Sequence, residues 1–332
     1  MPIVDAIHDL GHTIEGDDAW SESYYFNAFD PIADAGFFTR IGVRPNEGTI
    51  DVGMSVWLPD GRLAEYRHRR AERGMADTVL EVGAVRYEML EAMTTWRITL
   101  DAGVPARPCR RSAPGDGVVR LALDARFEAL TPAIGTDGQR SGGPRSAAAA
   151  AAARTVGKGH FEQAGAWRGQ VVVDGVRVEL AAAKGNRDRS WGPRRWGGPR
   201  MWRWFSINVG DDVHFGGIRL GTDAGDLHRG WVWDGEQASS VAEWRIRTDV
   251  EDDGVTQRVV HLEVEDKASR TFALRGDVLR VADIGRAGST LVNEGLARWT
   301  YVDPRGVERV GYGICEYLHQ LDALGTPLVA VE

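Results

Sequence analysis

The sequence is poor in cysteine and in long apolar runs. Cys109 and Cys315 are its only cysteines, and more than 200 residues separate them. Secreted proteins held together by disulfides use more cysteines at closer spacing, so we expect two reduced thiols and a cytoplasmic location. Residues 1–18 contain acidic side chains and lack the apolar core of a signal peptide. No stretch approaches about 18 consecutive apolar residues, so no membrane span is expected.

An excess of charge of one sign is also lacking. The chain has 40 Lys and Arg against 48 Asp and Glu, giving a net charge of −8, and the two signs are mixed along it. Nucleic-acid-binding proteins usually carry a basic stripe, which this sequence does not have. The motifs G-x-G-x-x-G, G-x-x-x-x-G-K-[ST] and H-E-x-x-H do not occur in a suitable context either. We therefore expect no nucleic-acid partner, no cofactor and no metal site.

Alternation of apolar and polar residues with a period of two runs through most of the chain. Residues 48–58 alternate and end at Pro59-Asp60-Gly61, which is a turn signal. Residues 170–180 form two alternating arms around Asp174-Gly175, the strongest short-range signal for a β-hairpin. Many short strands and 41 glycines predict an all-β protein made of antiparallel barrels or sandwiches.

Helix signals are confined to one region. Residues 131–146 are polar and rich in Gly and Pro, which predicts a flexible loop, and the alanines of 147–154 predict a short helix. The length of the chain suits two domains of roughly 150 residues each. A Gly/Pro/Arg-rich break lies at 192–199. We therefore expect an N-terminal β domain at 1–194, with the loop and helix inserted in it, and a C-terminal β domain at 195–332.

Two segments bring titratable residues together. His160 and Glu162 lie two positions apart on an expected strand, so both point to one face and could form an acid/base pair. Asp188 stands between Arg187 and Arg189. If the arginines contact it, Asp188 stays ionised; if they point away and tryptophans enclose it, burial raises its pKa and makes it a proton donor. The structural alternatives are a surface pair at a strand start, and ion pairs that join the two domains.

Aromatic residues are unevenly distributed. Seven of the 12 tryptophans lie within 54 residues, and rings recur at alternate positions of several expected strands, so they share a sheet face. Such a face packs against a second sheet or lines an apolar cavity. Glu316, in an otherwise apolar last strand, is expected to pair with an arginine. The expected ligand-contacting residues are Tyr24, Tyr25, Trp191, Trp202, Trp204, Arg187 and Glu316.

Several strings resemble the AttH/carotenoid 1,2-hydratase superfamily, in particular a bacterial branch of it. They are SESYYFN, TRIGVRPNEG, HFEQ, RDRSWGPR and GYGICEYL, and they cover both halves of the chain. The resemblance implies two lipocalin-like β-barrels in tandem. It also implies that Asp188 corresponds to the acidic position of the hydratases and His160 to their upstream histidine. This chain departs from the hydratases by carrying arginines on both sides of Asp188, which argues against hydration in particular.

The residues and the resemblance together predict a cofactor-free enzyme for a small hydrophobic substrate of isoprenoid, steroid or polyketide type. Hydration, isomerisation and cyclisation are the expected reactions, with Asp188, His160 and Glu162 as acid/base groups. One alternative is a non-catalytic carrier of a lipophilic ligand. In another, the Arg/Trp-rich segment 184–204 is only a structural link between the domains. The sequence leaves a homodimer open.

Overall fold

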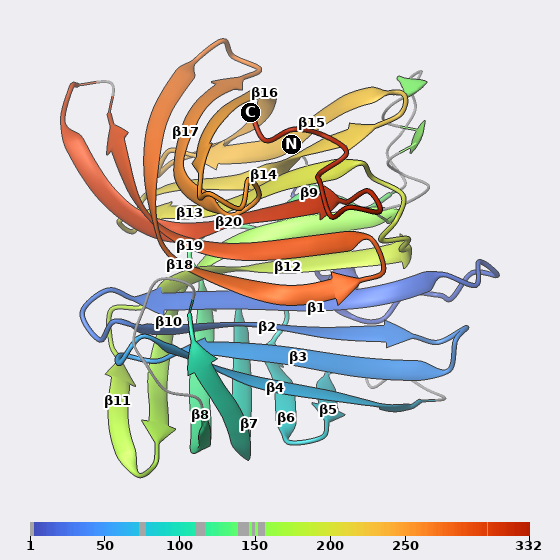
Figure 1. Cartoon of the computed structure of the whole chain (residues 1–332), viewed down its shortest axis with the longest axis vertical. Coiled ribbons are helices and arrows are strands. Elements are labelled where there is room, and N and C mark those ends of the chain that lie inside the picture. The colour runs from blue at the N-terminus through green and yellow to red at the C-terminus, as the bar shows by residue number, and fades with distance from the viewer. Residues whose placement is uncertain are drawn as a thin grey trace. The chain divides into compact units, whose positions relative to one another are not determined.

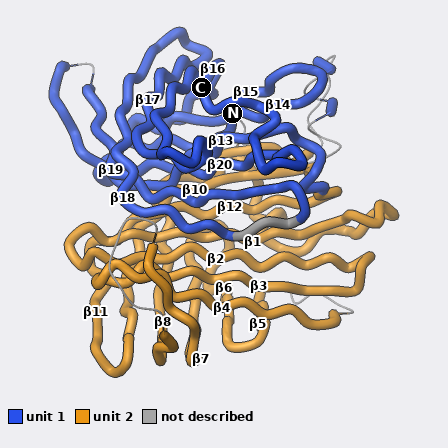
Figure 2. Tube along the Cα trace, in the orientation of Figure 1, with its two compact units in different colours: residues 1, 141–156, 195–332 blue, residues 2–140, 157–194 orange. Residues whose placement is uncertain are grey.

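The structure, a computed structural model, consists almost entirely of antiparallel strands (Figure 1). It describes residues 3–72, 78–109, 117–138, 146–147, 150–151, 157–303 and 305–332. The predicted all-β fold is confirmed. The chain forms two compact units (Figure 2): an N-terminal unit of residues 3–138 and 157–194, and a C-terminal unit of residues 195–332 with the described residues between 141 and 156. Independent folding of each unit as a domain, with a boundary at 194/195, stays a prediction.

The N-terminal unit contains one sheet of twelve strands. They are β1 (Trp20–Asp30), β2 (Ala35–Arg44), β3 (Thr49–Trp57), β4 (Arg62–Ala71), β5 (Val79–Val82), β6 (Val85–Glu91), β7 (Thr95–Pro108), β8 (Gly117–Ala129), β9 (Ile134–Thr136), β10 (Gly159–Val173), β11 (Val176–Leu180) and β12 (Lys184–Pro193). Their order is β11-β10-β12-β1-β2-β3-β4-β7-β6-β5, and β8 pairs with both β7 and β10. Because the pairing returns from β7 through β8 to β10, these strands close a ring around the core.

The C-terminal unit is a closed barrel whose strands follow one another in sequence order, with β13 paired to β20. The strands are β13 (Met201–Val209), β14 (Val213–Thr222), β15 (Gly225–Trp233), β16 (Ala238–Val250), β17 (Gln257–Asp266), β18 (Thr271–Ala287), β19 (Thr290–Val302) and β20 (Glu308–Gln320). This closed barrel matches the lipocalin-like architecture that the resemblance implied.

Both predicted turns are found between paired strands. Asp174 and Gly175 connect β10 to β11 with φ angles of 49° and 85°, the left-handed backbone that a two-residue hairpin turn requires. Gly61, with φ at 84°, lies in the turn between β3 and β4. Local turn chemistry therefore sets the register of these two pairs.

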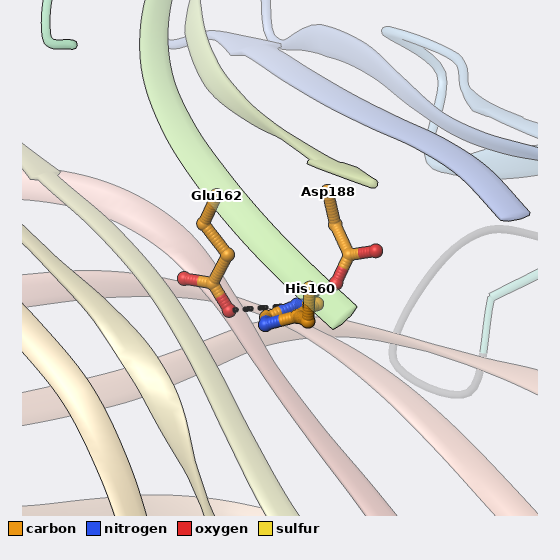
Figure 3. Close-up of side chains that lie close together, drawn as sticks. All are labelled: His160, Glu162 and Asp188. Atoms are coloured by element: carbon orange, nitrogen blue, oxygen red, sulfur yellow. Dashed lines mark hydrogen bonds and ion pairs between the residues drawn. The ribbon is translucent and has the colours of Figure 1, made fainter. Parts of the chain in front are cut away.

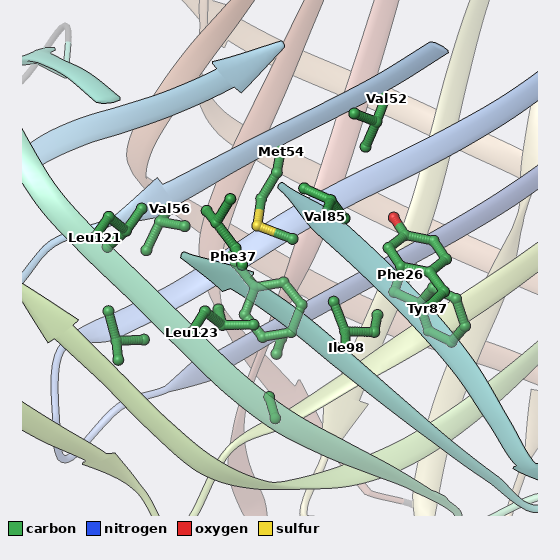
Figure 4. Close-up of a cluster of buried hydrophobic side chains, with 14 of the residues drawn as sticks. Phe26, Phe37, Val52, Met54, Val56, Val85, Tyr87, Ile98, Leu121 and Leu123 are labelled. Atoms are coloured by element: carbon green, nitrogen blue, oxygen red, sulfur yellow. The ribbon is translucent and has the colours of Figure 1, made fainter. Parts of the chain in front are cut away.

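Each unit encloses its own apolar core. Figure 4 shows part of the N-terminal core, where aromatic and branched side chains from many strands meet. Its large buried rings include Phe26, Phe37, Tyr87, Trp96 and Trp167. The core of the barrel includes Phe205, Phe215, Trp244, Trp299 and Tyr317. Full burial of one such apolar side chain stabilises the fold by about 1.5–3 kcal/mol, so these clusters account for the closure of each sheet.

The prediction of a loop at 131–146 was wrong in part. Ile134–Thr136 form β9 and pair with the start of β10, because Ile134 is buried and Gly135 allows a close backbone approach. A Cβ atom at Gly135 would lie 2.1 Å from the main-chain oxygen of His160. Of the predicted helix at 147–154, Ala147, Ala150 and Ala151 are described and helical; the rest of both segments lies outside the described residues. Across the described ranges, no helix combines the length and apolar character needed to cross a membrane.

Candidate active site

Strand β12 sends its side chains alternately to the two faces of the N-terminal sheet. Arg187 and Arg189 point to the face that carries the apolar core, where the guanidinium of Arg187 lies among aromatic rings. Asp188, between them in the sequence, points to the opposite face. The neighbouring strands place Glu162 of β10 directly across from Asp188 on one side and Tyr25 of β1 on the other. We call this opposite face the polar face.

His160, Glu162 and Asp188 form a compact group on the polar face (Figure 3). Nε2 of His160 lies 2.6 Å from Oδ2 of Asp188 and 3.6 Å from Oε1 of Glu162. The His160 side chain is 40% exposed, whereas those of Asp188 and Glu162 are 19% and 2% exposed. The fold therefore brings together the three residues that were expected to act as acid/base groups, and leaves the imidazole accessible.

The imidazole of His160 is held in its charged form. Desolvation acts to lower its pKa, but the negative charge of Asp188, the hydrogen bond to Asp188 and the charge of Glu162 outweigh this and raise the pKa to about 9. At neutral pH the His160 ring is therefore an imidazolium. Since Nε2 donates to Asp188, Nδ1–H is the group that remains for a ligand, because within the described residues it makes no hydrogen bond.

Arg187 has partners of its own on the core face. Its Nη1 donates to Oδ1 of Asp9 at 2.6 Å, and its Nε donates to Oε1 of Gln163 at 2.7 Å. Asp9 belongs to the single-turn helix η1 (Ala6–Asp9), and both members of the ion pair are buried. A buried pair of this kind fastens the N-terminal segment to the sheet.

Arg189 is also paired on the core face, with the buried carboxylate of Glu22. Its guanidinium carbon lies 3.9 Å from the ring centre of Tyr24. Burial acts to raise the pKa of Glu22, but the charge of Arg189 and the hydrogen bond from His12 lower it below the ordinary value. Of the two arrangements considered for Asp188, the arginines therefore point away, and an imidazole rather than a tryptophan lies beside the carboxylate.

Arg40 of β2 extends the polar face and was not singled out from the sequence. It lies across from Tyr25, its Nε donates to Oγ of Ser23 at 2.8 Å, and Nη1 lies 3.8 Å from Asp51. The guanidinium folds over Gly42, where a Cβ atom would come within 2.6 Å of Nη1. The sequence offered one signal for the position of Arg40: a glycine follows it two residues later on the same strand. Because residues two apart share a face, the missing side chain of Gly42 leaves room there for the guanidinium.

The positive charge of Arg40 acts on the same polar face as His160, Glu162 and Asp188. Burial lowers the pKa of Arg40 to about 10, opposed by the charge of Asp51, so the guanidinium remains charged at neutral pH. The charges of Asp188 and Arg194 also act on Arg40, and that of Arg194 acts on His160. The polar face thus combines an imidazolium, carboxylates and at least one further cation.

The expected ligand-contacting residues fall into three places. Tyr25 lies on the polar face, whereas Tyr24, Trp191 and Arg187 lie on the core side of the N-terminal unit. Trp202, Trp204 and Glu316 belong to the C-terminal unit. There, Nε1 of Trp202 donates to Oε1 of Glu316 at 2.6 Å, and Trp204 pairs with Glu316 in register. The expected arginine partner of Glu316 is neither Arg187 nor Arg189, which are paired with Asp9 and Glu22.

The same three residues offer a set of metal ligands. One ligand atom from each of His160, Glu162 and Asp188 lies within 4.8 Å of the others. An imidazole and two carboxylates could hold a divalent transition metal. The 2.6 Å contact between His160 and Asp188 is, however, the length of a charge-assisted hydrogen bond. The absence of a metal stays a prediction.

The fold is similar to several solved structures of low sequence identity. A protein described as AttH from Nitrosomonas europaea is 14% identical, with a TM-score of 0.61 and coverage of 96% of this chain and 98% of that chain. Kievitone hydratase from Nectria haematococca is 12% identical, with a TM-score of 0.63 and coverage of 96% and 93%. The structure of CghA with Sch210972 is 12% identical, with a TM-score of 0.61 and coverage of 91% and 88%. The predicted resemblance to the AttH/carotenoid 1,2-hydratase superfamily is confirmed at the level of the fold.

Sequence comparison places the chain in a family without reference to fold. No curated protein matches it. The family model described as "Domain of unknown function (DUF7064)" matches residues 5–321, which is nearly the whole sequence. The chain therefore belongs to the DUF7064 family.

Proposed function

We propose that the protein catalyses an acid–base reaction (hydration, isomerisation or cyclisation) on a small hydrophobic substrate, with His160 as the proton-transferring group. The observation that carries the proposal is the 2.6 Å contact between His160 and Asp188 on an accessible sheet face, beside the second carboxylate of Glu162. Histidines whose pKa is shifted by a specific charged partner are typical of functional sites. Asp188 and Glu162 hold the imidazole in place and stabilise its charge.

The pKa of His160 favours one kind of substrate. A group with a pKa of about 9 is a weak acid, and its conjugate base takes up a proton readily. Such a group suits proton transfer at an oxygen, or at a carbon activated by a carbonyl group. Protonation of an isolated alkene needs a far stronger acid. Among the substrate types considered, an oxygenated polyketide-like molecule therefore fits better than an unfunctionalised isoprenoid.

Arg40 supplies a second anchor for such a substrate. Ser190 and Ser23 lie in register between His160 and Gly42, over which Arg40 folds. Neighbouring strands lie about 4.8 Å apart, so the guanidinium lies on the order of 10–14 Å from the imidazole. A molecule of two or three fused rings spans this distance. Its oxyanion would be stabilised by Arg40 while the proton moves at Nδ1 of His160.

One similar structure supports hydration as the first reaction to test, because it is named kievitone hydratase. The assay uses a panel of α,β-unsaturated ketones and polyketide-like diketones in D2O, followed by mass spectrometry. Hydration adds one water and places one deuterium at carbon, while isomerisation or cyclisation leaves the formula unchanged apart from any deuterium taken up at carbon. Terpenes that lack oxygen serve as the comparison set.

Variants identify the groups responsible. His160→Gln and Asp188→Asn are expected to reduce product formation at least about 100-fold, the usual contribution of a positioned acid or base. Asp124→Asn is the matched control, because Asp124 pairs with Arg97 in an exposed part of the same sheet. Full turnover by His160→Gln would contradict the proposal. Recovery of every bound compound chemically unchanged would instead favour a carrier.

A further inference from the structure

The C-terminal barrel contains a buried cation that the proposed reaction does not use. Arg203 of β13 is 0% exposed, and its guanidinium carbon lies 4.3 Å from the ring centre of Tyr317 in the barrel core. Its Nη1 donates to the main-chain oxygens of Trp202 and Leu318. Within the described residues, Nε and Nη2 have no hydrogen-bond partner. Because a buried, unpaired charge is unfavourable, this guanidinium indicates a place for an anion.

A carboxylate of the chain itself lies at this end of the barrel. The side chain of Glu332 pairs with Arg219, and its main-chain oxygen accepts a hydrogen bond from the N–H of Thr248. The hydroxyl of Thr248 lies 2.6 Å from that of Tyr317, the ring under Arg203. Glu332 therefore contacts Arg219 and Thr248, and its charge acts on the buried cation Arg203.

The residue before Glu332 completes the arrangement. Val331 packs against the apolar core of the barrel. Val331 and Glu332 thus present an apolar group and a carboxylate, side by side, to one end of the barrel. A ligand that takes the place of this pair would therefore carry the same two kinds of group, one apolar and one carboxylate.

The segment that carries these two residues is held by few contacts. Residues 322–332 form no strand; besides the contacts of Glu332 with Arg219 and Thr248, their pairing to the barrel consists of an isolated bridge between Leu321 and Pro327 and a hydrogen bond from Leu328 to Gln320. The side chain of Leu324 is 92% exposed. A segment with little buried apolar surface opens at low free-energy cost, so it can be displaced while the barrel stays folded.

We propose that this end of the C-terminal barrel binds a small carboxylic acid with an apolar tail, and that Val331 and Glu332 occupy the site as a built-in competitor. Arg203 and Arg219 would bind the carboxylate, with the hydroxyls of Thr248 and Tyr317 beside it. The space taken by Val331 would receive the apolar tail. Ligand binding would release residues 322–332 from the barrel.

The charges around the site fit an anion. Burial lowers the pKa of Arg203, and the charges of Tyr317 and Glu332 oppose that change. His319, whose ring centre lies 6.2 Å from that of Tyr317, has its pKa lowered to about 3 by burial and by the charge of Arg203. It is therefore neutral near pH 7, which leaves Arg203 and Arg219 as the cations of the site.

Calorimetric titration with octanoate tests the proposal, with octanamide as the uncharged probe. The full chain carrying Val331→Ala and Glu332→Ala together should bind octanoate at least tenfold more tightly than the wild type, because the competitor is gone. It should bind octanamide at least tenfold more weakly than octanoate. Adding Arg203→Gln should remove the gain, whereas Arg309→Gln, which breaks an exposed pair with Asp212 on the same barrel, should not.

Two results would overturn the proposal: no tighter binding by the folded double variant, or equal binding of octanoate and octanamide. The comparison of the two probes needs no change at Arg203, so it remains decisive if Arg203→Gln fails to fold. Near-ultraviolet circular dichroism of each variant establishes that the barrel is intact. The site uses none of the residues assigned to the acid–base reaction, so either proposal can fail without the other.

Discussion

Asp188 sets the charge of His160, and this can be measured directly. Asp188→Asn removes the negative charge 2.6 Å from the imidazole, so the pKa of His160 should fall from about 9 toward the ordinary value near 6.5. Titration of the His160 ring signals by NMR gives both values. Asp124→Asn should leave them unchanged. A His160 pKa that is the same in Asp188→Asn and in the wild type would show that another group holds the charge.

The same pair predicts a pH dependence of stability. The pKa of His160 is raised in the folded state, so its contribution to stability is fully present below about pH 6.5 and is lost as the pH rises through about 9. The free energy of unfolding of the wild type should therefore exceed that of His160→Gln at pH 6, and the difference should shrink by pH 9.5. Urea denaturation at both pH values provides the measurement. A difference that grows with pH would refute this sign.

The position of Arg40 depends on the missing side chain of residue 42. Gly42→Ala places a methyl group where the guanidinium lies, so Arg40 must move and substrate binding should weaken about tenfold, the effect of losing one charged hydrogen bond. The measurement is KM and kcat with the substrate found in the D2O assay. Gly53→Ala on the adjacent strand is the control, because a Cβ atom there meets nothing within 4 Å. Equal KM values for the two variants would show that Arg40 does not bind the substrate.

At the scale of elements, η1 and β12 are joined by the buried pair of Asp9 and Arg187. Asp9→Asn leaves Arg187 charged and buried without its carboxylate, which should cost about 3–5 kcal/mol of unfolding free energy. Breaking the exposed Arg97–Asp124 pair by Asp124→Asn should cost at most about 1 kcal/mol. Guanidinium denaturation of both variants makes the comparison. Losses of similar size would mean that the pair does not fasten the segment.

The strands themselves were largely predictable because period-two alternation is a local signal. The turns at 59–61 and 174–175 followed from local chemistry as well. Strand β9 was missed because three residues are too few to show a period, and their partner lies in β10, beyond the predicted helix. A short segment takes its conformation from a distant neighbour, which the sequence does not reveal.

From the sequence, only those relations within the site that lie along a single strand could be predicted. His160 and Glu162 share a face by alternation, which the sequence states directly. The contact of His160 with Asp188, 28 positions away, depends on the register of β10 against β12. The place of Arg40 depends on a further pairing, β1 with β2. The question whether the arginines contact Asp188 was likewise left open, since their partners Asp9 and Glu22 lie more than 160 residues earlier.

At the scale of the whole molecule, each unit has a closed arrangement of strands and a core of its own. If the units are separate domains, as we propose, differential scanning calorimetry should resolve two transitions. Asp9→Asn should lower the melting temperature of one of them, and Phe205→Leu in the barrel core should lower that of the other. A single transition that both variants shift equally would show that the chain unfolds as one unit.

The alternation of side chains along β12 determines what a substitution in this strand affects. Its odd-numbered residues from 187 to 191 lie on the core side, and its even-numbered residues from 186 to 190 face the other way. Changes that affect stability and changes that affect the polar face therefore fall at alternate positions of the same strand. A substitution at position 188 therefore changes the group on the polar face, whereas substitutions at 187 and 189 break the buried ion pairs with Asp9 and Glu22. An insertion of one residue, by contrast, would exchange the two faces of the strand and disrupt both the buried ion pairs and the group on the polar face.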